Sequence, residues 1–356
     1  MNFSRLFLLF LMSTFGKLAR IAGSKHPVSD AFPILFLLWL LPVSAQAQQL
    51  LAGEREAQVT AIPGVVAAGS QWQLLWADFV TADGIVGTAD GGVLFAQEQT
   101  DTIVKLNSDG QEFVYLENTN GGGSISLDAQ GQLFAVQRTC TEIMNPELPG
   151  CNELTRVAVL APQYKLLANS FADGEPLGRL NDLIADGKGG AYFTSGGAYY
   201  VNARGVVSIV AQDIRANGIM LSPDGKTLYV TDNTVVLAFT VAANGATSGR
   251  RTFAALNGDD GGDGMAVDAQ GRLYVTASLG VHVLSAKGDY LGLIPTPRRA
   301  ITLAFSGPEK KTLYVPQMGA VGPDGKAWTT PEGIRNTAMT IYTLPMLTPG
   351  YAGRPK

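Results

Sequence analysis

The chain has 356 residues, of which 46% are hydrophobic and 16% are charged, with 26 Lys and Arg against 30 Asp and Glu. The small acidic excess, and the lack of basic clusters interleaved with aromatic residues, exclude nucleic acid as a partner. The length and the high content of Gly and Val favour a single all-β domain with a large core.

The first 47 residues are expected to be an export signal. Four basic residues precede a 13-residue apolar run, Ala31–Val43, which is followed by a small-residue cleavage signal at Ser44–Ala47. The run is too short for a good membrane span, although an uncleaved anchor is the alternative. Removal of residues 1–47 leaves 22 Lys and Arg against 29 Asp and Glu. We expect an exported protein, periplasmic or secreted, with one domain over residues 48–356 and no stable membrane span after cleavage.

A short block then recurs six times, made of a polar turn and an apolar or aromatic residue followed by Phe or Tyr. The copies centre on Leu94-Phe95, Leu133-Phe134, Tyr192-Phe193, Leu228-Tyr229, Leu273-Tyr274 and Leu313-Tyr314. The aromatic residues are 39, 59, 36, 45 and 40 residues apart, a period typical of four-stranded propeller blades. We predict a six-bladed β-propeller around a central channel. Residues from about 65 to 78 and from about 339 to 346 are expected to pair and close the ring.

The longest interval between copies contains the only cysteines of the chain, Cys140 and Cys151. In an exported protein such a pair predicts a disulfide, with two free thiols as the alternative. Closing so short a loop would contribute at most about 3 kcal/mol. We expect this interval to be an insertion in the second blade at the rim of a pocket.

One register position in the repeat carries oxygen-bearing side chains. Eleven or twelve residues before the aromatic stand Asp83, Asn181, Asn217 and Asp263 in four copies, and Gly122 and Thr302 in the other two. Equivalent positions in a propeller surround its axis, so we expect these side chains to converge. Two carboxylates and two amides suit a hard divalent cation such as Ca²⁺. Taken singly, each is weak evidence, because Asn-Gly and Asp-Gly are ordinary turn sequences.

These residues resemble the family of senescence marker protein, gluconolactonase and luciferin-regenerating enzyme, which is regucalcin-like. The similarity covers about Asp83 to Val315 and rests on Arg179-Leu-Asn181-Asp182, Asn217-Gly-Ile, the run Ser222–Asp232 and Asp263-Gly-Met-Ala-Val-Asp. It implies a six-bladed propeller that hydrolyses sugar lactones with a divalent metal in the channel. The metal is commonly calcium, with Zn²⁺, Mn²⁺ and Mg²⁺ as alternatives.

The resemblance also implies roles by position. Asn217 and Asp263 would be metal ligands, and Asp263 would also be the general base. Arg179 and Asn181 would face the substrate or metal-bound water. With the register position of Asp83 added, the predicted metal set is Asp83, Asn181, Asn217 and Asp263, and the predicted substrate-binding pair is Arg179 and Asn181.

The chain departs from the family pattern in three places. The family usually has Glu where this chain has Asp83, so Glu98 is an alternative ligand. Bacterial relatives tend to have an acidic residue near Gln137 and an Asn near Ile301-Thr302, and both are absent here. These departures bear on substrate preference.

We therefore expect a metal-dependent hydrolase of lactones or related cyclic esters, in which water attacks a metal-polarised carbonyl and Asp263 acts as ligand and base. The alternatives are a non-catalytic binding propeller with a structural calcium ion and a phosphotriesterase-like hydrolase. His282 is expected to be structural, and residues 257–262 a solvated loop. Ser195 lies in Thr-Ser-Gly-Gly, which lacks the pattern of a nucleophile elbow.

Overall fold

The protein is described by a computed structural model over residues 50–139, 154–319, 329–330, 333–334 and 338–353. The predicted signal at residues 1–47 lies outside these ranges, as do Cys140 and Cys151, so the signal and the disulfide stay predictions. Within the described ranges no helix is long and apolar enough to cross a membrane.

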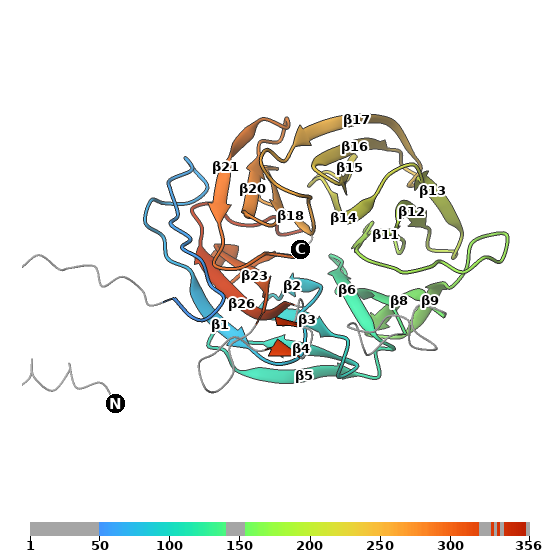
Figure 1. The fold of residues 1–356 in the computed structure, drawn as a ribbon. Coiled ribbons are helices and arrows are strands. Elements are labelled where there is room, and N and C mark those ends of the chain that lie inside the picture. Colours follow the sequence, from blue (N-terminus) through green and yellow to red (C-terminus); the bar gives the residue numbers. More distant parts are fainter. Residues whose placement is uncertain (1–49, 140–153, 320–328, 331–332, 335–337, 354–356) are drawn as a thin grey trace, which may run out of the picture. The chain divides into compact units, whose positions relative to one another are not determined.

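The described residues form six four-stranded antiparallel sheets that surround a common axis, and this confirms the predicted six-bladed β-propeller (Figure 1). Blade 1 consists of β2 (Ile85–Gly87), β3 (Val93–Gln97), β4 (Thr102–Leu106) and β5 (Glu112–Glu117). Blade 2 consists of β6 (Gly122–Leu127), β7 (Leu133–Gln137), β8 (Arg156–Ala161) and β9 (Lys165–Ala168). Blade 3 consists of β10 (Leu183–Ala185), β11 (Ala191–Ser195), β12 (Gly197–Val201) and β13 (Val207–Ala211).

The second half of the ring repeats this order. Blade 4 consists of β14 (Ala216–Leu221), β15 (Thr227–Asp232), β16 (Val235–Val241) and β17 (Thr247–Ala255). Blade 5 consists of β18 (Met265–Val267), β19 (Leu273–Thr276), β20 (Gly280–Leu284) and β21 (Tyr290–Pro295). Blade 6 consists of β22 (Ala304–Ser306), β23 (Thr312–Met318), β26 (Ala338–Pro345) and β1 (Gln73–Ala77), with the 3₁₀ turn η1 (Pro308–Lys310) and the short pair β24 (Thr329–Thr330) and β25 (Gly333–Ile334) between its strands.

The two ends of the domain close the ring within blade 6. Strand β1 pairs antiparallel with β26 from the C-terminal part, which confirms the predicted pairing. The N-terminal strand is shorter than expected, because residues before Gln73 run as irregular chain. Val65 and Val66 are buried there, and the Trp72 indole N–H donates to the Pro295 carbonyl at 2.7 Å. This segment therefore packs against blades 5 and 6 instead of extending the strand.

Burial decreases from the axis outwards. The inner strands β2, β10 and β18 are buried at every residue, since neighbouring blades pack on both of their faces. The outer strand β5 is exposed at five of its six residues. This gradient explains why β2, β10 and β18 consist of apolar and small residues.

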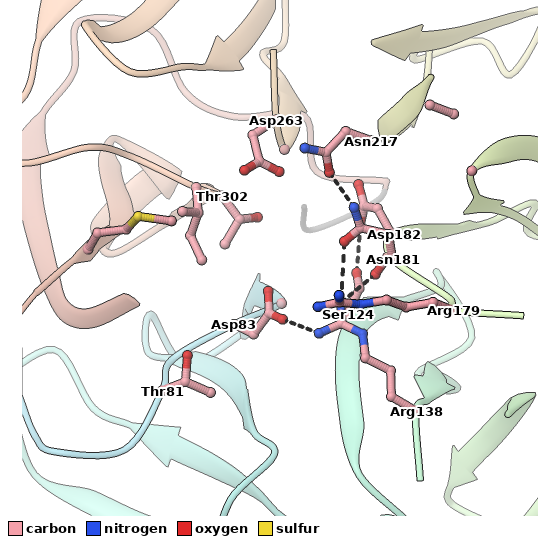
Figure 2. Close-up of a pocket in the computed structure, with 16 residues that line it drawn as sticks. Thr81, Asp83, Ser124, Arg138, Arg179, Asn181, Asp182, Asn217, Asp263 and Thr302 are labelled. Carbon is pink, nitrogen blue, oxygen red and sulfur yellow. Dashed lines mark hydrogen bonds and ion pairs between the residues drawn. The ribbon is translucent and has the colours of Figure 1, made fainter. Parts of the chain in front are cut away.

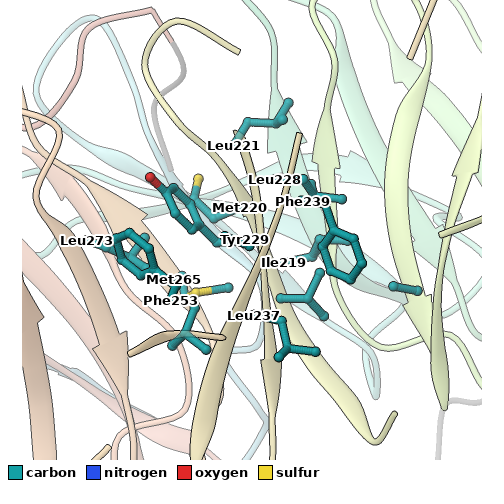
Figure 3. Close-up of a cluster of buried hydrophobic side chains, with 14 of the residues drawn as sticks. Ile219, Met220, Leu221, Leu228, Tyr229, Leu237, Phe239, Phe253, Met265 and Leu273 are labelled. Carbon is teal, nitrogen blue, oxygen red and sulfur yellow. The ribbon is translucent and has the colours of Figure 1, made fainter. Parts of the chain in front are cut away.

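The repeated aromatic residue lies in the second strand of each blade and is buried in all six copies. Around blade 4, apolar side chains of β14, β15 and β16 meet those of β18 and β19 from blade 5 (Figure 3). Ile219 and Tyr229 belong to blade 4 in this cluster, and Met265 and Leu273 to blade 5. The core in this part of the molecule is thus built between blades.

Candidate functional site

The predicted ring residues line one cavity on the propeller axis, with a volume of about 610 Å³. Asp83, Asn181 and Asp263 each lie two residues before the inner strand of their blade, and Asn217 is the second residue of β14. Arg179 lines the same cavity, as does Thr302 at the equivalent position of blade 6. Figure 2 shows their side chains around the common space. The structure therefore brings together all of the predicted site residues.

Glycine follows three of these residues because neighbouring inner strands approach each other closely there. A Cβ at Gly218 would lie 2.0 Å from the Asp263 carbonyl oxygen, and one at Gly84 would lie 2.4 Å from Ser124 Cα. The Gly264 N–H donates to the Ile301 carbonyl of blade 6 at 2.9 Å. The Asp-Gly and Asn-Gly pairs are thus contacts between blades, not only turn sequences.

In blade 3 an aspartate, Asp182, takes the place of that glycine. Its carboxylate accepts hydrogen bonds from Ser124 Oγ of blade 2 at 2.5 Å and from the Ile219 N–H of blade 4 at 3.0 Å. Asp182 lies on the cavity wall, but its oxygens hold three blades together. We assign it a structural role.

Asp263 is the chemically distinctive residue of the cavity. Its side chain is half-buried and makes no hydrogen bond or ion pair to any described residue. Burial, together with the Asp83 and Asp182 carboxylates, raises the pKa of Asp263 to about 8, against the weaker attraction of Arg299 and Arg138. Burial and the neighbouring carboxylates thus outweigh the attraction of the nearby guanidinium groups.

Asn217 and Asn181 contact each other beside Asp263. The Asn181 Nδ2 donates to Asn217 Oδ1 at 2.5 Å. Within the described ranges no three His, Cys, Asp or Glu side chains come together as a metal site. A cation in this cavity would therefore draw on amide as well as carboxylate oxygens. Such a donor set fits a hard cation such as Ca²⁺ and fits poorly with Zn²⁺, which prefers nitrogen and sulfur.

Arg138 is the residue of the site that the sequence did not reveal. It follows β7 in blade 2, and its guanidinium donates to Asp83 Oδ2 at 2.6 Å and to Glu98 Oε1. Burial alone would lower the pKa of Arg138, but the Glu98 and Asp83 carboxylates outweigh it and raise the pKa. The guanidinium is therefore charged at any relevant pH.

Glu98, the alternative ligand, is enclosed behind Arg138 and does not line the cavity. Burial raises the pKa of Glu98 to about 7, the attraction of Arg138 opposes this, and the nearby Asp83 adds to the rise. The charged form of Arg138 is thus favoured and that of Glu98 is not. Arg138 is attracted by two carboxylates, whereas Glu98 shares one guanidinium with Asp83. Glu98 Oε2 has no hydrogen-bond partner among the described residues.

We predict that Glu98→Gln flattens the pH dependence of stability. Because the folded-state pKa of Glu98 lies above the ordinary glutamate value of 4.5, the native protein keeps a proton that the unfolded chain releases. Its contribution to stability is complete below about pH 4.5 and is lost as the pH rises through 7. Relative to wild type, the variant should gain up to about 3 kcal/mol between pH 4.5 and pH 8. Urea unfolding at both pH values measures this, with the exposed Glu117→Gln as the control, and equal pH slopes in all three proteins would contradict it.

Arg179 is exposed and lines the cavity, and its guanidinium makes no hydrogen bond or ion pair within the described part of the chain. Figure 2 shows it pointing towards the cavity, as Arg138 does. The donors of Arg138 are engaged by the protein, whereas those of Arg179 are available to a ligand.

Three other predictions have structural outcomes. The Ser195 hydroxyl donates to the Leu177 carbonyl at 2.6 Å, so it is held away from the role of a nucleophile. The His282 side chain is fully buried and its Nε2 lies 3.0 Å from Asp259 Oδ2. The interpretation of residues 257–262 as a solvated loop was wrong for Asp259, because its buried carboxylate also accepts from the Ser278 and Leu279 N–H groups at 2.9 and 3.0 Å.

The fold and the cavity define a six-bladed propeller with a polar central site. The model of the SMP-30/gluconolactonase/LRE-like region matches residues 64–318. This chain belongs to that family, and the resemblance seen in the sequence is confirmed.

Two curated relatives illustrate the range of similarity. The chain is 24% identical over 197 residues to the gluconolactonase of Zymomonas mobilis subsp. mobilis, in a match that covers 47% of this chain and 55% of that protein. It is 34% identical over 139 residues to lactonase drp35 of Staphylococcus aureus strain MW2, covering 34% of this chain and 43% of that protein. The chain thus spans about half the length of the curated relatives it matches.

Solved structures share the fold over nearly their whole length. A gluconolactonase from Xanthomonas campestris has a TM-score of 0.63 at 21% identity, covering 85% of this chain and 99% of that one. A regucalcin from Agrobacterium tumefaciens, described as calcium-binding, has a TM-score of 0.57 at 18% identity, covering 79% and 97%. At these identities the comparison concerns the fold.

Proposed function

We propose that this protein hydrolyses lactones or related cyclic esters with the help of a divalent cation in the central cavity. The observation that carries the proposal is the Asp263 carboxylate, which is half-buried, has no hydrogen-bond or ion-pair partner among the described residues, and lines the same cavity as Asn217 and Arg179. Membership of a family that includes gluconolactonases supports the substrate class. The cavity of about 610 Å³ suits a small molecule.

Three side chains of the cavity would have different roles. Arg179 would bind the hydroxyl groups or an anionic group of the substrate, because its donors are not used by the described protein. Asn181 would contact the substrate or a water beside it. Asp263 would accept a hydrogen bond from the attacking water and orient or deprotonate it as a general base.

A cation would be held by oxygens of Asp83, Asn181, Asn217 and Asp263. The chemistry that such a cation supplies when bound is polarisation of the lactone carbonyl and activation of water. The oxygen-only donor set favours Ca²⁺, with Mg²⁺ and Mn²⁺ next and Zn²⁺ last.

Purified protein, stripped with EDTA and reloaded with one cation at a time, tests the proposal against a panel of aldonolactones, a simple cyclic ester and a phosphotriester. We expect lactone hydrolysis that disappears on chelation and returns best with Ca²⁺. Calcium binding without turnover of any compound would instead support a binding propeller with a structural ion. Turnover of the phosphotriester alone would support the phosphotriesterase-like alternative.

We also propose that the chain is exported, cleaved after Ala47 and oxidised to a Cys140–Cys151 disulfide. The apolar run before Ala47 and the even pair of cysteines support this proposal. A non-reduced tryptic digest of exported protein should contain one peptide pair linked through these cysteines, and the mature N-terminus should begin at Gln48. Recovery of both cysteines as free thiols would contradict the prediction.

A further inference from the structure

The ring of oxygens has a gap in blade 2, and an arginine fills it. Gly122 stands at the ring register of this blade and Gly123 follows it. A Cβ at Gly123 would lie 2.4 Å from Arg138 Cζ. The guanidinium therefore lies directly over the inner strand β6, in space that a side chain at Gly123 would occupy.

From this position the guanidinium contacts three blades. Its Nε donates to the Leu180 carbonyl of blade 3 at 2.9 Å, and its Nη2 donates to the Asn181 carbonyl at 2.8 Å and to Asn181 Oδ1 at 3.4 Å. Its Nη1 donates to Asp83 and Glu98 of blade 1. A guanidinium has five N–H donors, and here five acceptors match them. Arg138 thus has no donor left for a substrate.

We propose that Arg138 is a positioning residue of the site: it fixes Asp83 and Asn181 from the blade 2 position and places a permanent positive charge where a ring oxygen of blade 2 would stand. This inference rests on the proposed function. Arg138 donates a hydrogen bond to Asp83 Oδ2, and Asp83 Oδ1 accepts no hydrogen bond from the described residues. Glu98 lies behind the wall of the cavity in contact with Arg138, so it is a partner of Arg138 and not a ligand.

The charge and the shape of Arg138 have separable consequences. Its positive charge repels a cation in the cavity, so removal of the charge should strengthen cation binding. Its planar fork orients Asn181, and a lysine cannot reproduce that geometry because an ammonium is a point charge with three donors. A residue that only stabilised the fold would produce neither effect.

Three variants test this by calcium titration calorimetry and by steady-state kinetics on the best lactone of the panel. Arg138→Met should bind Ca²⁺ at least about tenfold more tightly than wild type while it hydrolyses lactone less efficiently. Arg138→Lys and Gly123→Ala keep the charge but loosen Asp83 and Asn181, so they should not bind Ca²⁺ more tightly than wild type, while KM rises at least about tenfold. Arg204→Met removes an exposed charge from the turn between β12 and β13 and should change neither quantity.

The outcomes separate this inference from the proposed function. If wild type hydrolyses lactone and all three variants match it in KM and Ca²⁺ affinity, the role of Arg138 is refuted and the function stands. If Arg138→Met does not fold, wild-type KM in both Arg138→Lys and Gly123→Ala refutes it equally. If wild type neither binds Ca²⁺ nor turns over lactone, the function is refuted, and the inference then depends on Arg138→Met: gain of Ca²⁺ binding supports it and no gain refutes it.

Discussion

Replacement of Asp263 by asparagine should lower kcat on a lactone substrate by at least about a hundredfold at saturating Ca²⁺, because a general base typically contributes 10²–10⁴-fold. Asparagine has nearly the same shape and keeps one oxygen that can coordinate a cation. It loses the negative charge and the second acceptor that would hold the attacking water. Cation binding should therefore weaken without vanishing.

The same exchange should leave the cation-free protein at least as stable as wild type. The Asp263 carboxyl has a pKa raised to about 8 by burial and by the neighbouring Asp83 and Asp182, so its ionised form is unfavourable in the folded state. A neutral amide removes that cost. A thermal melt in EDTA at pH 8 should show an equal or higher Tm for Asp263→Asn. This is the result expected of a residue that serves function and lowers the stability of the fold.

Arg179→Ala is the matched comparison, since it alters the same cavity at the proposed substrate contact. If Arg179 binds ground state and transition state equally, this variant should raise KM more than it lowers kcat. Near wild-type turnover by Asp263→Asn at full cation occupancy would show that the catalytic assignment is wrong and would favour the binding propeller.

The fold could be predicted from the sequence because each blade repeats the same physical requirement. A buried aromatic in the second strand packs against the neighbouring blade, and that contact recurs with the period of the blade. The register of Asp83, Asn217 and Asp263 follows from the same repeat. Their convergence on the axis could therefore be predicted from the sequence. The first residue of β1 could not be predicted in this way. Val65 and Val66 are as apolar as strand residues, but they pack as irregular chain.

Arg138 escaped prediction because its role depends on three blades at once. It stands in Val-Gln-Arg-Thr, a sequence with no signal of its own, and its partners Glu98 and Asn181 lie 40 and 43 residues away along the chain. The one available sign was the pair Gly122-Gly123, where a side chain is missing from an otherwise regular ring. Asp259 was misjudged for a related reason, since the partners of its carboxylate lie in the next hairpin.

Asn217→Ala should weaken calcium binding by at least about a hundredfold, since loss even of a residue behind a metal ligand commonly costs 10–100-fold. Asn217 supplies a neutral amide oxygen beside Asp263, and its Oδ1 also accepts from Asn181 Nδ2 at 2.5 Å. Alanine removes the ligand and releases the Asn181 amide, so two of the four proposed oxygens are affected together.

The fold should survive this substitution, because the contact that anchors Asn217 to blade 3 is made by its backbone. Its carbonyl accepts from Thr194 Oγ1 at 2.6 Å, and alanine preserves that bond. Asn244→Ala is the control: this asparagine lies in the turn between β16 and β17 of the same blade, does not line the cavity, and has a side chain that accepts from the Ala246 N–H at 3.1 Å. Titration calorimetry should give wild-type Ca²⁺ affinity for Asn244→Ala and a large loss for Asn217→Ala, with similar thermal melts in EDTA. Unchanged affinity in Asn217→Ala would mean that the cation, if one binds, is held elsewhere than by this ring, and the roles of Asp83, Asn181 and Asp263 as ligands would then be abandoned together.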